Sequence, residues 1–409
     1  MPNLALVPRP VALSLTPIEV AARCRHLPGF VFFDSALETS SDTQLSIVAA
    51  RPRAKIHGRD WNLLREAVAA HQIESGIDDA LPHGFAAGFV EYDGTHCFGV
   101  YEDALIYRHA DESWHELGAL CKDLSSAPVP ASAVAPGFRP TMSRERFCAM
   151  IQRAQQYIDA GDIYQVSLAH PFTARWQGDS FRFYEALRHY SPAPFAALLA
   201  LDNRTILSSS PESFLRMSGR SIRTRPIKGT RPRLANHHAD EKSAYDLLTS
   251  PKEIAELIMI TDLERNDLGK VCEYGSVTVP ALLELERFQQ VFHLVSTVQG
   301  TLREETDHVT ALRACFPGGS VTGAPKKRAR EIIAELESTP RGVYTGCLGW
   351  FGFNGESQFN ISIRTVVVEA THAHFHVGAG IVADSVPELE WHETLDKAAG
   401  ILLAAERLE

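Results

Sequence analysis

Apolar residues recur at helical spacing in residues 143–162, on a face formed by Phe147, Met150, Ile151, Ala154 and Ile158. Ser143 before them is a suitable N-cap and Gly161 after them a suitable end, so a helix is predicted between the two. A second helix is predicted after Ser250, because Pro251 takes the first helical position and Glu253 follows three residues after the cap. A longer helix is predicted over residues 387–407.

Short apolar runs typical of strands occur between these helices. They occupy residues 30–36, 45–52, 84–94, 163–169, 346–353, 359–370 and 374–383. The predicted strands outnumber the helices without alternating with them regularly, which favours a mixed α/β (α+β) protein with large antiparallel sheets over a doubly wound parallel one. Residues 125–141 are rich in Pro and Ala, and we expect them to link residues 1–124 to residues 142–409.

The composition is that of a globular enzyme. Of 409 residues, 45% are hydrophobic and 22% are charged, and the net charge of −10 argues against a general nucleic-acid-binding protein. The sequence has no apolar run of about 18 residues and no signal-peptide pattern, so we expect a cytoplasmic protein without a membrane span. The seven cysteines are dispersed without a CxxC pair, which indicates reduced thiols rather than disulfides or a zinc site.

Two pairs of glutamates share the same spacing. Glu253 and Glu256 lie in the second predicted helix, and Glu390 and Glu393 lie in the last, so each pair falls on one helix face. Two such helices could together hold Mg²⁺, a hard cation that binds a few carboxylates along with water and an anionic substrate. The alternative is that both pairs are ordinary solvated faces, and Glu253 could also serve the Ser250 cap. Glu256 lacks that structural explanation and is the better candidate ligand.

Two glycine-rich segments and one arginine could bind carboxylates. Residues 316–328, FPGGSVTGAPKKR, lack the spacing of a phosphate loop but lead from a turn into a helix N-terminus, where free amides bind anions. Residues 377–385, VGAGIVADS, are predicted to form a second such turn. Arg364, in a predicted strand of apolar and small residues, could bind a carboxylate through two hydrogen bonds. Together these features predict a pocket for a small acid with two carboxylates and a metal ion.

The chain also contains eight motifs in the order found in chorismate-utilising enzymes. They are SPES, PIKGTRPR, DLERNDLGKV, VFHLVSTVQG, FPGGSVTGAPKKRA, ISIRT, GAGIVADS and EWHETLDKAAG. The chain resembles this family over residues 143–409 and more loosely before them. The family includes anthranilate synthase component I, aminodeoxychorismate synthase component I, isochorismate synthase and salicylate synthase. The resemblance implies one large α/β unit with two sheets sandwiched between helices.

The resemblance implies roles for the candidate residues. Glu256, Glu390 and Glu393, supported by Glu253, would hold Mg²⁺, which would bind the ring carboxylate of chorismate. Glu212 in SPES would be the general acid that protonates the departing C4 hydroxyl. The residues that would contact the substrate are Gln165, His293, Thr322, Gly323, Ala324, Tyr344, Arg364, Gly378, Gly380 and Lys397.

Two positions distinguish the reactions of this family. Its members that add water carry a lysine base where this chain has Gln165, so the resemblance favours ammonia as the nucleophile. Lys228 stands in PIKGT, the form typical of aminodeoxychorismate enzymes, where anthranilate synthases have PIAGT. Ammonia entering at C2 leads to anthranilate, whereas a lysine that enters C2 first lets ammonia enter at C4 and expel it. The resemblance therefore implies a synthetic subunit that makes 4-amino-4-deoxychorismate for the p-aminobenzoate and folate branch.

A nucleophilic lysine must be a neutral amine. Neutralising a lysine of reference pKa ~10.4 at pH 7 costs about 4.6 kcal/mol, and burial or nearby cations would lower that cost. Arg225, Arg231 and Arg233 are close to Lys228 in sequence and are candidates for those cations. The alternative is that Lys228 is a positioned cation that only binds a substrate carboxylate.

The sequence leaves three hypotheses for function. It shows no Cys–His–Glu machinery of a glutaminase, so the leading hypothesis expects ammonia from a separate glutamine amidotransferase subunit. The nearest alternative is an anthranilate synthase component I with an unusual lysine, which would yield anthranilate and pyruvate. The third is a catalytically inactive chorismate-binding subunit, and the complete set of glutamates speaks against it. Departures from the family pattern at His170, Pro171 and Leu234 involve no proposed ligand.

Overall fold

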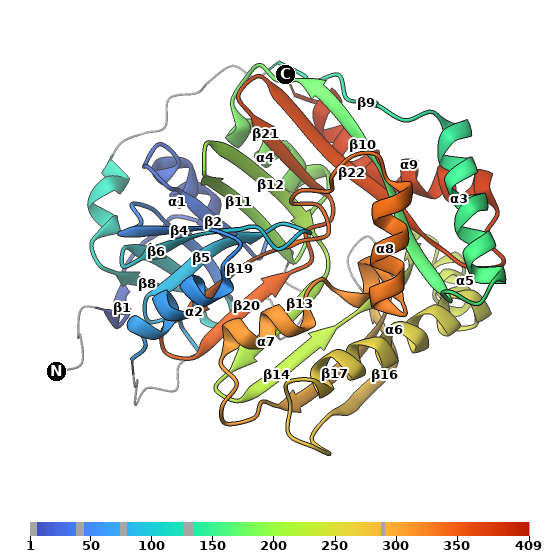
Figure 1. Cartoon of the computed structure of the whole chain (residues 1–409). Helices are drawn as coiled ribbons and strands as arrows, with labels where there is room; N and C mark the ends of the chain where they lie inside the picture. The colour runs from blue at the N-terminus through green and yellow to red at the C-terminus, as the bar shows by residue number, and fades with distance from the viewer. Residues whose placement is uncertain (1–5, 38–44, 74–79, 126–133, 288–290, 409) are drawn as a thin grey trace.

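The structure is a computed structural model that describes residues 6–37, 45–73, 80–125, 134–287 and 291–408. Two large sheets lie among helices (Figure 1), and the strands that the structure describes pair antiparallel throughout. The predicted fold class is therefore confirmed.

The first sheet has twelve strands. Its order is β1 (Arg9–Val11), β8 (Ser113–Leu117), β7 (Ala104–Arg108), β3 (Leu45–Ala49), β2 (Val31–Asp34), β11 (Phe195–Leu201), β12 (Arg204–Ser210), β21 (Thr365–Glu369), β22 (His372–Ile381), β10 (Gln165–Arg175) and β18 (Gly323–Ala324), and β9 (Arg139–Pro140) pairs with β10.

The second sheet has ten strands. Its order is β15 (Ile227–Pro232), β17 (Val291–Thr301), β14 (Ser221–Arg225), β13 (Ser213–Ser218), β20 (Glu356–Asn360), β19 (Cys347–Gly352), β5 (Phe85–Val90), β6 (His96–Tyr101) and β4 (Ala54–Gly58), and β16 (Thr278–Arg287) pairs with β17.

The α-helices are α1 (Pro17–Cys24), α2 (Trp61–Ala70), α3 (Arg144–Asp159), α4 (Ser180–Tyr190), α5 (His237–Leu248), α6 (Pro251–Gly269), α7 (His308–Cys315), α8 (Lys326–Leu336) and α9 (Pro387–Glu406). Short 3-10 helices occupy His109–Asp111, Leu120–Ser125 and Gly319–Val321. None of the helices that the structure describes is long and apolar enough to cross a bilayer.

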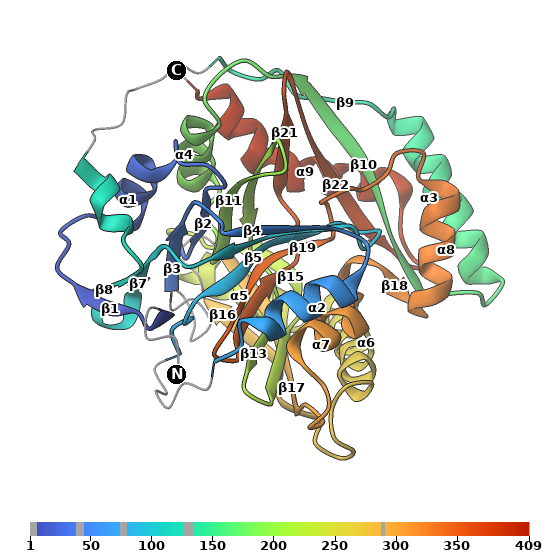
Figure 2. The same cartoon turned by 60° about the vertical axis from the view of Figure 1, so that its left-hand side comes forward.

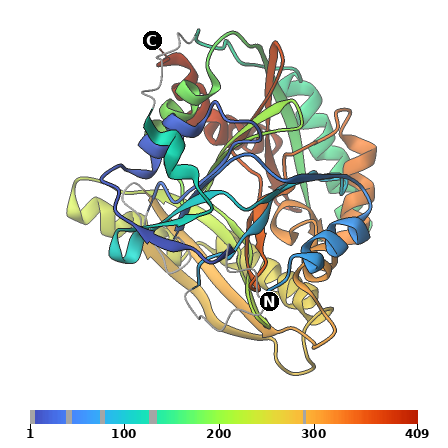
Figure 3. The ribbon, with the colours of Figure 1, turned by 90° about the vertical axis from the view of Figure 1, so that its left-hand side faces the viewer.

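The layers follow from the alternation of side chains along the strands. In β11, Ala197 and Leu199 belong to the core between the two sheets, while Ala196 and Leu198 belong to a second core that α1, α4 and α9 cover. Figure 3 shows these three helices together on one side of the molecule. Because both faces of β11 are buried, its sequence FAALLAL is apolar throughout.

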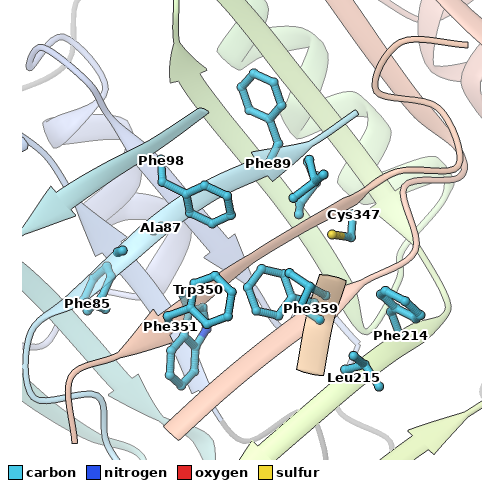
Figure 4. Close-up of a cluster of buried hydrophobic side chains, with 14 of the residues drawn as sticks. Phe85, Ala87, Phe89, Phe98, Phe214, Leu215, Cys347, Trp350, Phe351 and Phe359 are labelled. Carbon is cyan, nitrogen blue, oxygen red and sulfur yellow. The ribbon is translucent and has the colours of Figure 1, made fainter. Parts of the chain in front are cut away.

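The core between the sheets is rich in aromatic side chains. The ring centroids of Phe98 and Phe351 are 5.6 Å apart, and those of Phe351 and Phe359 are 4.6 Å apart. Figure 4 shows these rings with Phe85 and Trp350 of the same core. Rings at such distances bury large apolar areas, so this core holds the two sheets together.

A separate helical layer covers β10 and β22, the strands nearest the candidate site. Phe147 and Ile151 of α3, Ile332 of α8, Ile381 of β22 and Trp391 of α9 pack in one buried cluster. Figures 1 and 2 show α3 and α8 alongside β10. This packing fixes α9, which carries one of the two glutamate pairs, against β22.

The structure confirms the predicted caps with one correction. The hydroxyl of Ser143 accepts a hydrogen bond from Arg146 N at 3.3 Å, and that of Ser250 accepts one from Glu253 N at 3.5 Å. The reciprocal bond predicted for the Glu253 carboxylate is replaced, because Ser250 N donates to the carbonyl of Leu247. The carboxylate of Glu253 therefore does not accept the hydrogen bond from Ser250 N that a capping box would have.

Segments before and after the predicted linker share both sheets. The first sheet contains β1, β2, β3, β7 and β8 from residues 1–124 and β10, β11, β12, β21 and β22 from residues 142–409. Of the predicted linker, residues 126–133 lie outside the described residues. The seven cysteines are free thiols.

Candidate active site

The candidate site lies where β10 and β22 of the first sheet approach β15 of the second. A Cβ atom at Gly380 on β22 would lie 2.4 Å from Nε2 of Gln165 on β10 and 3.6 Å from Nζ of Lys228 on β15. A larger residue at position 380 would require the amide end of the Gln165 side chain to move. Gln165 and Lys228, the two residues from which the type of reaction was predicted, therefore face the same point in space.

Lys228 lies at an irregularity in its strand. The register of β15 against β17 shifts between Lys228 and Thr230. Nζ of Lys228 is 3.6 Å from Oε2 of Glu256, and the two side chains are 17% and 11% exposed. The ammonium also acts electrostatically on Glu212 and Glu393, so carboxylates from three parts of the chain surround it.

Two of the arginines next to Lys228 in the sequence are ion-paired with acids of their own. Arg225 forms an ion pair with Glu286, and Arg233 forms one with Asp240 at 3.0 Å. Their charges are compensated by these acids. That any of these arginines helps to neutralise Lys228 stays a prediction, and the ion pairs of Arg225 and Arg233 would weaken the repulsion on which it relies.

The two glutamate pairs act on one another across helices α6 and α9. Burial and then the charge of Glu256 raise the pKa of the Glu253 carboxyl, and Glu393 of α9 contributes in the same direction. Like charges brought together in this way are unfavourable unless a cation compensates them. The arrangement is therefore an acidic cluster and not two solvated helix faces.

Lysines compensate part of this negative charge. Nζ of Lys252 is 3.4 Å from Oε1 of Glu390, and Nζ of Lys397 is 2.7 Å from Oε1 of Glu393. Ser385 donates a hydrogen bond to the same Oε1 of Glu390 at 2.8 Å. Oε2 of Glu390 is buried and has no hydrogen-bond partner among the described residues. A buried carboxylate oxygen without a partner is an unsatisfied ligand atom.

The acidic cluster fits Mg²⁺ in the type of its ligands. Four carboxylates from two helices, with one oxygen of Glu390 unsatisfied, are the oxygen donors that this cation prefers. In the described parts of the chain, however, no three acidic, histidine or cysteine side chains are close enough to enclose an ion. Binding would therefore require Glu256 and Glu393 to turn away from Lys228 and Lys397.

Glu212 is buried directly before β13. Burial raises the pKa of its carboxyl, against the opposing effects of a hydrogen bond with the side chain of Ser320 and of the charges on Lys228 and Lys397. A carboxyl with a raised pKa holds its proton closer to neutral pH and is suited to general acid catalysis.

His293 and Arg364 influence each other electrostatically. Burial and then the charge of Arg364 lower the pKa of His293 to about 4, so the ring is neutral at pH 7. Nδ1 of His293 lies 2.9 Å from the hydroxyl of Thr230. Burial also lowers the pKa of the Arg364 guanidinium. A cation destabilised by burial is well placed to bind an anionic ligand.

The strand predicted over residues 359–370 is wrong in its middle. β20 ends at Asn360 and β21 begins at Thr365, and Arg364 between them has a φ of 49°. A positive φ takes a non-glycine residue out of the extended conformation. Residues 361–364 instead connect the second sheet to the first, which places Arg364 at the crossing between them.

Tyr344 and Lys397 approach β22 at Gly378. A Cβ atom at this glycine would lie 2.9 Å from the Tyr344 hydroxyl, and Nζ of Lys397 donates a hydrogen bond to the Gly378 carbonyl at 3.0 Å. The ring of Tyr344 stacks on His376 with centroids 5.4 Å apart. The turn predicted for residues 377–385 is wrong in its first half, because β22 continues to Ile381. The glycines of this segment allow neighbouring side chains to approach strand β22 closely.

The other glycine-rich segment has the predicted form. Gly323 and Ala324 form β18, with Ala324 opposite Gln165, and α8 begins two residues later. The hydroxyl of Thr322 donates a hydrogen bond to the Gly318 carbonyl at 2.9 Å and closes the turn. Residues 322–324 therefore border the site next to Gln165.

Comparison with known proteins places this site in a family. The family model described as chorismate binding enzyme matches residues 39–403. The chain belongs to this family. Among curated relatives, it is similar to aminodeoxychorismate synthase component 1 of Klebsiella aerogenes, with 43% identity over 314 residues, 74% of this chain and 69% of that protein. It is also 44% identical to anthranilate synthase component 1 of Geobacillus stearothermophilus over 266 residues, 65% of this chain. The match spans only 52% of that relative.

Solved structures agree with the fold. Anthranilate synthase component I from Streptococcus pneumoniae superposes with a TM-score of 0.79 at 30% identity, covering 89% of this chain and 93% of that one. The menaquinone-specific isochorismate synthase from Escherichia coli superposes with a TM-score of 0.80 at 18% identity, covering 98% and 93%. At that identity the second likeness supports the fold alone.

Three polar residues at the candidate site were not predicted. They are Lys252, Ser320 and Ser385, which contact or influence the proposed glutamates. Lys252 could have been found, because it lies one helical turn before Glu256 and can face the same cluster. The two serines lie in the glycine-rich segments 316–328 and 377–385, but nothing in those segments indicates the carboxylates that they contact.

Proposed function

We propose that this chain makes 4-amino-4-deoxychorismate from chorismate and ammonia, with Lys228 as a covalent nucleophile. The observation that carries the proposal is the place of the Lys228 amine, which faces Gly380 together with Gln165 and lies within electrostatic reach of Glu212. A nucleophile and a buried acid are thus available on the chain itself. The name of the Klebsiella aerogenes relative supports this reaction.

In the first step, the neutral amine of Lys228 forms a bond to C2 of chorismate. The electrons of the ring diene shift, and the bond between C4 and its hydroxyl breaks. Glu212 gives its proton to this hydroxyl, which leaves as water. The burial that raises the pKa of Glu212 favours the protonated form that this step requires.

In the second step, ammonia forms a bond to C4 from which the hydroxyl departed. The diene shifts back, the bond between C2 and Nζ breaks, and Lys228 recovers its electron pair. One proton returns from the new C4 ammonium group to Glu212, which restores the acid. Gln165 cannot accept a proton from water at neutral pH, which leaves ammonia as the nucleophile. We propose a glutamine amidotransferase partner as its source.

The remaining residues would bind and orient the substrate. Arg364 and the hydroxyl of Tyr344, with the backbone at Gly378 and Gly380, would bind the enolpyruvyl carboxylate, and neutral His293 would lie beside the ring. Mg²⁺, held by the glutamates of α6 and α9, would supply the positive charge that fixes the ring carboxylate. Lys397 would add positive charge at the same end of the pocket.

A second function is supported by the relatives that are named anthranilate synthase component 1. In that reaction ammonia would enter at C2 and Lys228 would serve as a cation. Incubation with chorismate, Mg²⁺ and an ammonium salt separates the two functions. The proposed enzyme should release 4-amino-4-deoxychorismate, whereas anthranilate and pyruvate formed without any added lyase would refute the proposal.

Mass spectrometry of the protein tests the covalent step. With chorismate and Mg²⁺ but no ammonia, the peptide that contains Lys228 should gain the mass of chorismate less one water. Lys228→Ala should lose the adduct and the 4-amino product or divert nitrogen to C2. Lys55→Ala, an exposed lysine on β4 at the opposite edge of the second sheet, should retain both. A wild-type product and rate in Lys228→Ala would refute the nucleophilic role.

A further inference from the structure

Two buried acids, Glu264 and Asp267, lie on α6 after the residues of the acidic cluster, Glu253 and Glu256. Their exposed fractions are 2% and 0%. Asp267 is fully paired, because its two oxygens contact Nζ of Lys270 at 2.7 Å and Nζ of Lys326. Glu264 is only half satisfied. Its Oε1 accepts a hydrogen bond from Gly319 N at 2.9 Å, while its buried Oε2 has no partner among the described residues.

The surroundings of Glu264 favour its neutral form. The charged and titratable groups that act on it are Asp267 of the same helix, Lys326 of α8, Cys315 of α7 and Glu212 before β13. Burial is the largest effect and raises the pKa of the Glu264 carboxyl to about 7. An ionised carboxylate with one unpaired oxygen would be costly in this position, whereas a carboxylic acid carries no net charge there.

Glu264 is connected to Glu212 through one short turn. The amide that Glu264 holds belongs to Gly319, and the next residue, Ser320, hydrogen-bonds to Glu212. A Cβ atom at Gly319 would lie 2.9 Å from Oε1 of Glu264, so this approach requires glycine. Thr322 fastens the other end of the turn. Hydrogen bonds of Gly319 and Thr322 thus fix the turn on both sides of Ser320, whose side chain hydrogen-bonds to Glu212.

We propose that Glu264 is a positioning residue for the general acid: as a neutral carboxylic acid it holds the Gly319 amide, and through it the Ser320 hydroxyl, against Glu212. The proposal rests on the proposed function, because it assumes that Glu212 donates a proton. When Glu264 ionises, its negative charge makes Glu212 hold that proton more tightly and so weakens the acid. Glu264 itself does not contact the reacting atoms.

Two variants separate the hydrogen bond from the charge. Glu264→Gln keeps the carbonyl that accepts from Gly319 N but cannot ionise. Its kcat should stay within about threefold of wild type below pH 7, and the part of the fall in wild-type kcat that follows Glu264 ionisation near pH 7 should disappear, which changes the midpoint of the alkaline fall. Glu264→Asp is too short to reach the amide. Its kcat should fall roughly tenfold while KM for chorismate stays within about twofold, because a positioned general acid contributes about 10²–10⁴ to the rate.

Thr261→Val is the matched control. Thr261 lies one turn earlier on α6, is similarly buried, and its hydroxyl bonds only within the helix, to the Leu257 carbonyl. This variant should leave kcat, KM and the pH profile unchanged. An alkaline fall in kcat with the same midpoint in Glu264→Gln as in wild type, or a wild-type kcat in Glu264→Asp, would overturn the proposal. The rate is measured from whichever amino product forms. A failure of the proposed function would therefore appear in the identity of the product, and a failure of the role of Glu264 would appear in the kcat of the variants relative to wild type.

Infrared difference spectroscopy gives a readout that needs no turnover. A carboxylic acid C=O band should be lost as the pH rises through about 7 in the wild-type protein and should be absent from Glu264→Gln. Thermal unfolding of each variant checks that it is folded. A spectrum without this band in the folded wild-type protein would show that Glu264 is ionised and would refute the neutral form.

Discussion

Replacing Lys228 with methionine should strengthen Mg²⁺ binding, even though it removes the proposed nucleophile. Nζ of Lys228 lies 3.6 Å from Oε2 of Glu256, a proposed metal ligand, so the ammonium and the metal compete for the same carboxylate. The ammonium also repels a divalent cation that approaches the cluster. Methionine keeps a side chain of similar length without the charge, so it removes both effects with little change in volume.

The size of the effect follows from the distance between the two charges. Unit charges 3.6 Å apart attract by ~4.6 kcal/mol at an effective dielectric constant of about 20. This value is an upper bound, because both groups gave up hydration and remain 17% and 11% exposed. Taking about 1–2 kcal/mol as the competing free energy, Lys228→Met should bind Mg²⁺ about 5- to 30-fold more tightly.

Calorimetric titration of Mg²⁺ into the substrate-free protein at constant ionic strength measures this change directly. Lys55→Met is the control, because it removes the same charge from an exposed residue at the far edge of the second sheet. Its affinity should match wild type within about twofold, since salt screens distant surface charges. An unchanged or weaker affinity in Lys228→Met would show that Lys228 and the metal do not compete for Glu256, and the ligand set would have to be revised.

Three further outcomes are expected. Glu256→Gln should weaken Mg²⁺ binding about tenfold or more, and a titration curve that does not move would remove Glu256 from the ligand set. Arg341→Met should lower the free energy of unfolding by about 3–5 kcal/mol in denaturant titrations, because it leaves buried Glu337 without the ion-pair partner that lies 2.7 Å away. Burial raises the pKa of Glu264 from 4.5 to about 7, so the folded protein binds this proton more tightly than the unfolded chain. Unfolding free energy should therefore fall as the pH rises from about 4.5 to about 7, and Glu264→Gln should flatten this dependence.

Much of the fold could be predicted because its signals are local. The helix after Ser143 and the helix after Ser250 begin where their caps indicated, since a cap bonds to amides of its own first turn. The strand through Arg364 could not be predicted correctly. Apolar and small residues continue through residues 361–364, while the change of sheet shows only in the positive φ of Arg364.

The sequence indicated several residues that the structure brings together, but not the interactions between them. Glu256 and Lys228 were both singled out, but their ion pair brings together β15 and α6, and no spacing in the sequence encodes that contact. For Arg225 and Arg233 the charge was predicted but its acidic partner was not. They are close to Lys228 in sequence, yet each is compensated by an acid of its own. Sequence proximity therefore identified the charges and not their balance.

The proposed mechanism needs Glu212 protonated and Lys228 neutral at the same time, the reverse of the ordinary charge states of these groups. In water, moving a proton from a lysine of reference pKa ~10.4 to a glutamate of reference pKa ~4.3 costs about 8 kcal/mol. Burial penalises the charged form of Glu212 and raises the pKa of its carboxyl. A substrate that excludes water strengthens this effect, because a neutral pair loses less hydration than an ion pair. One proton transfer from Lys228 to Glu212 would then create the nucleophile and the acid together. The carboxylates around the lysine thus include the group that can accept its proton.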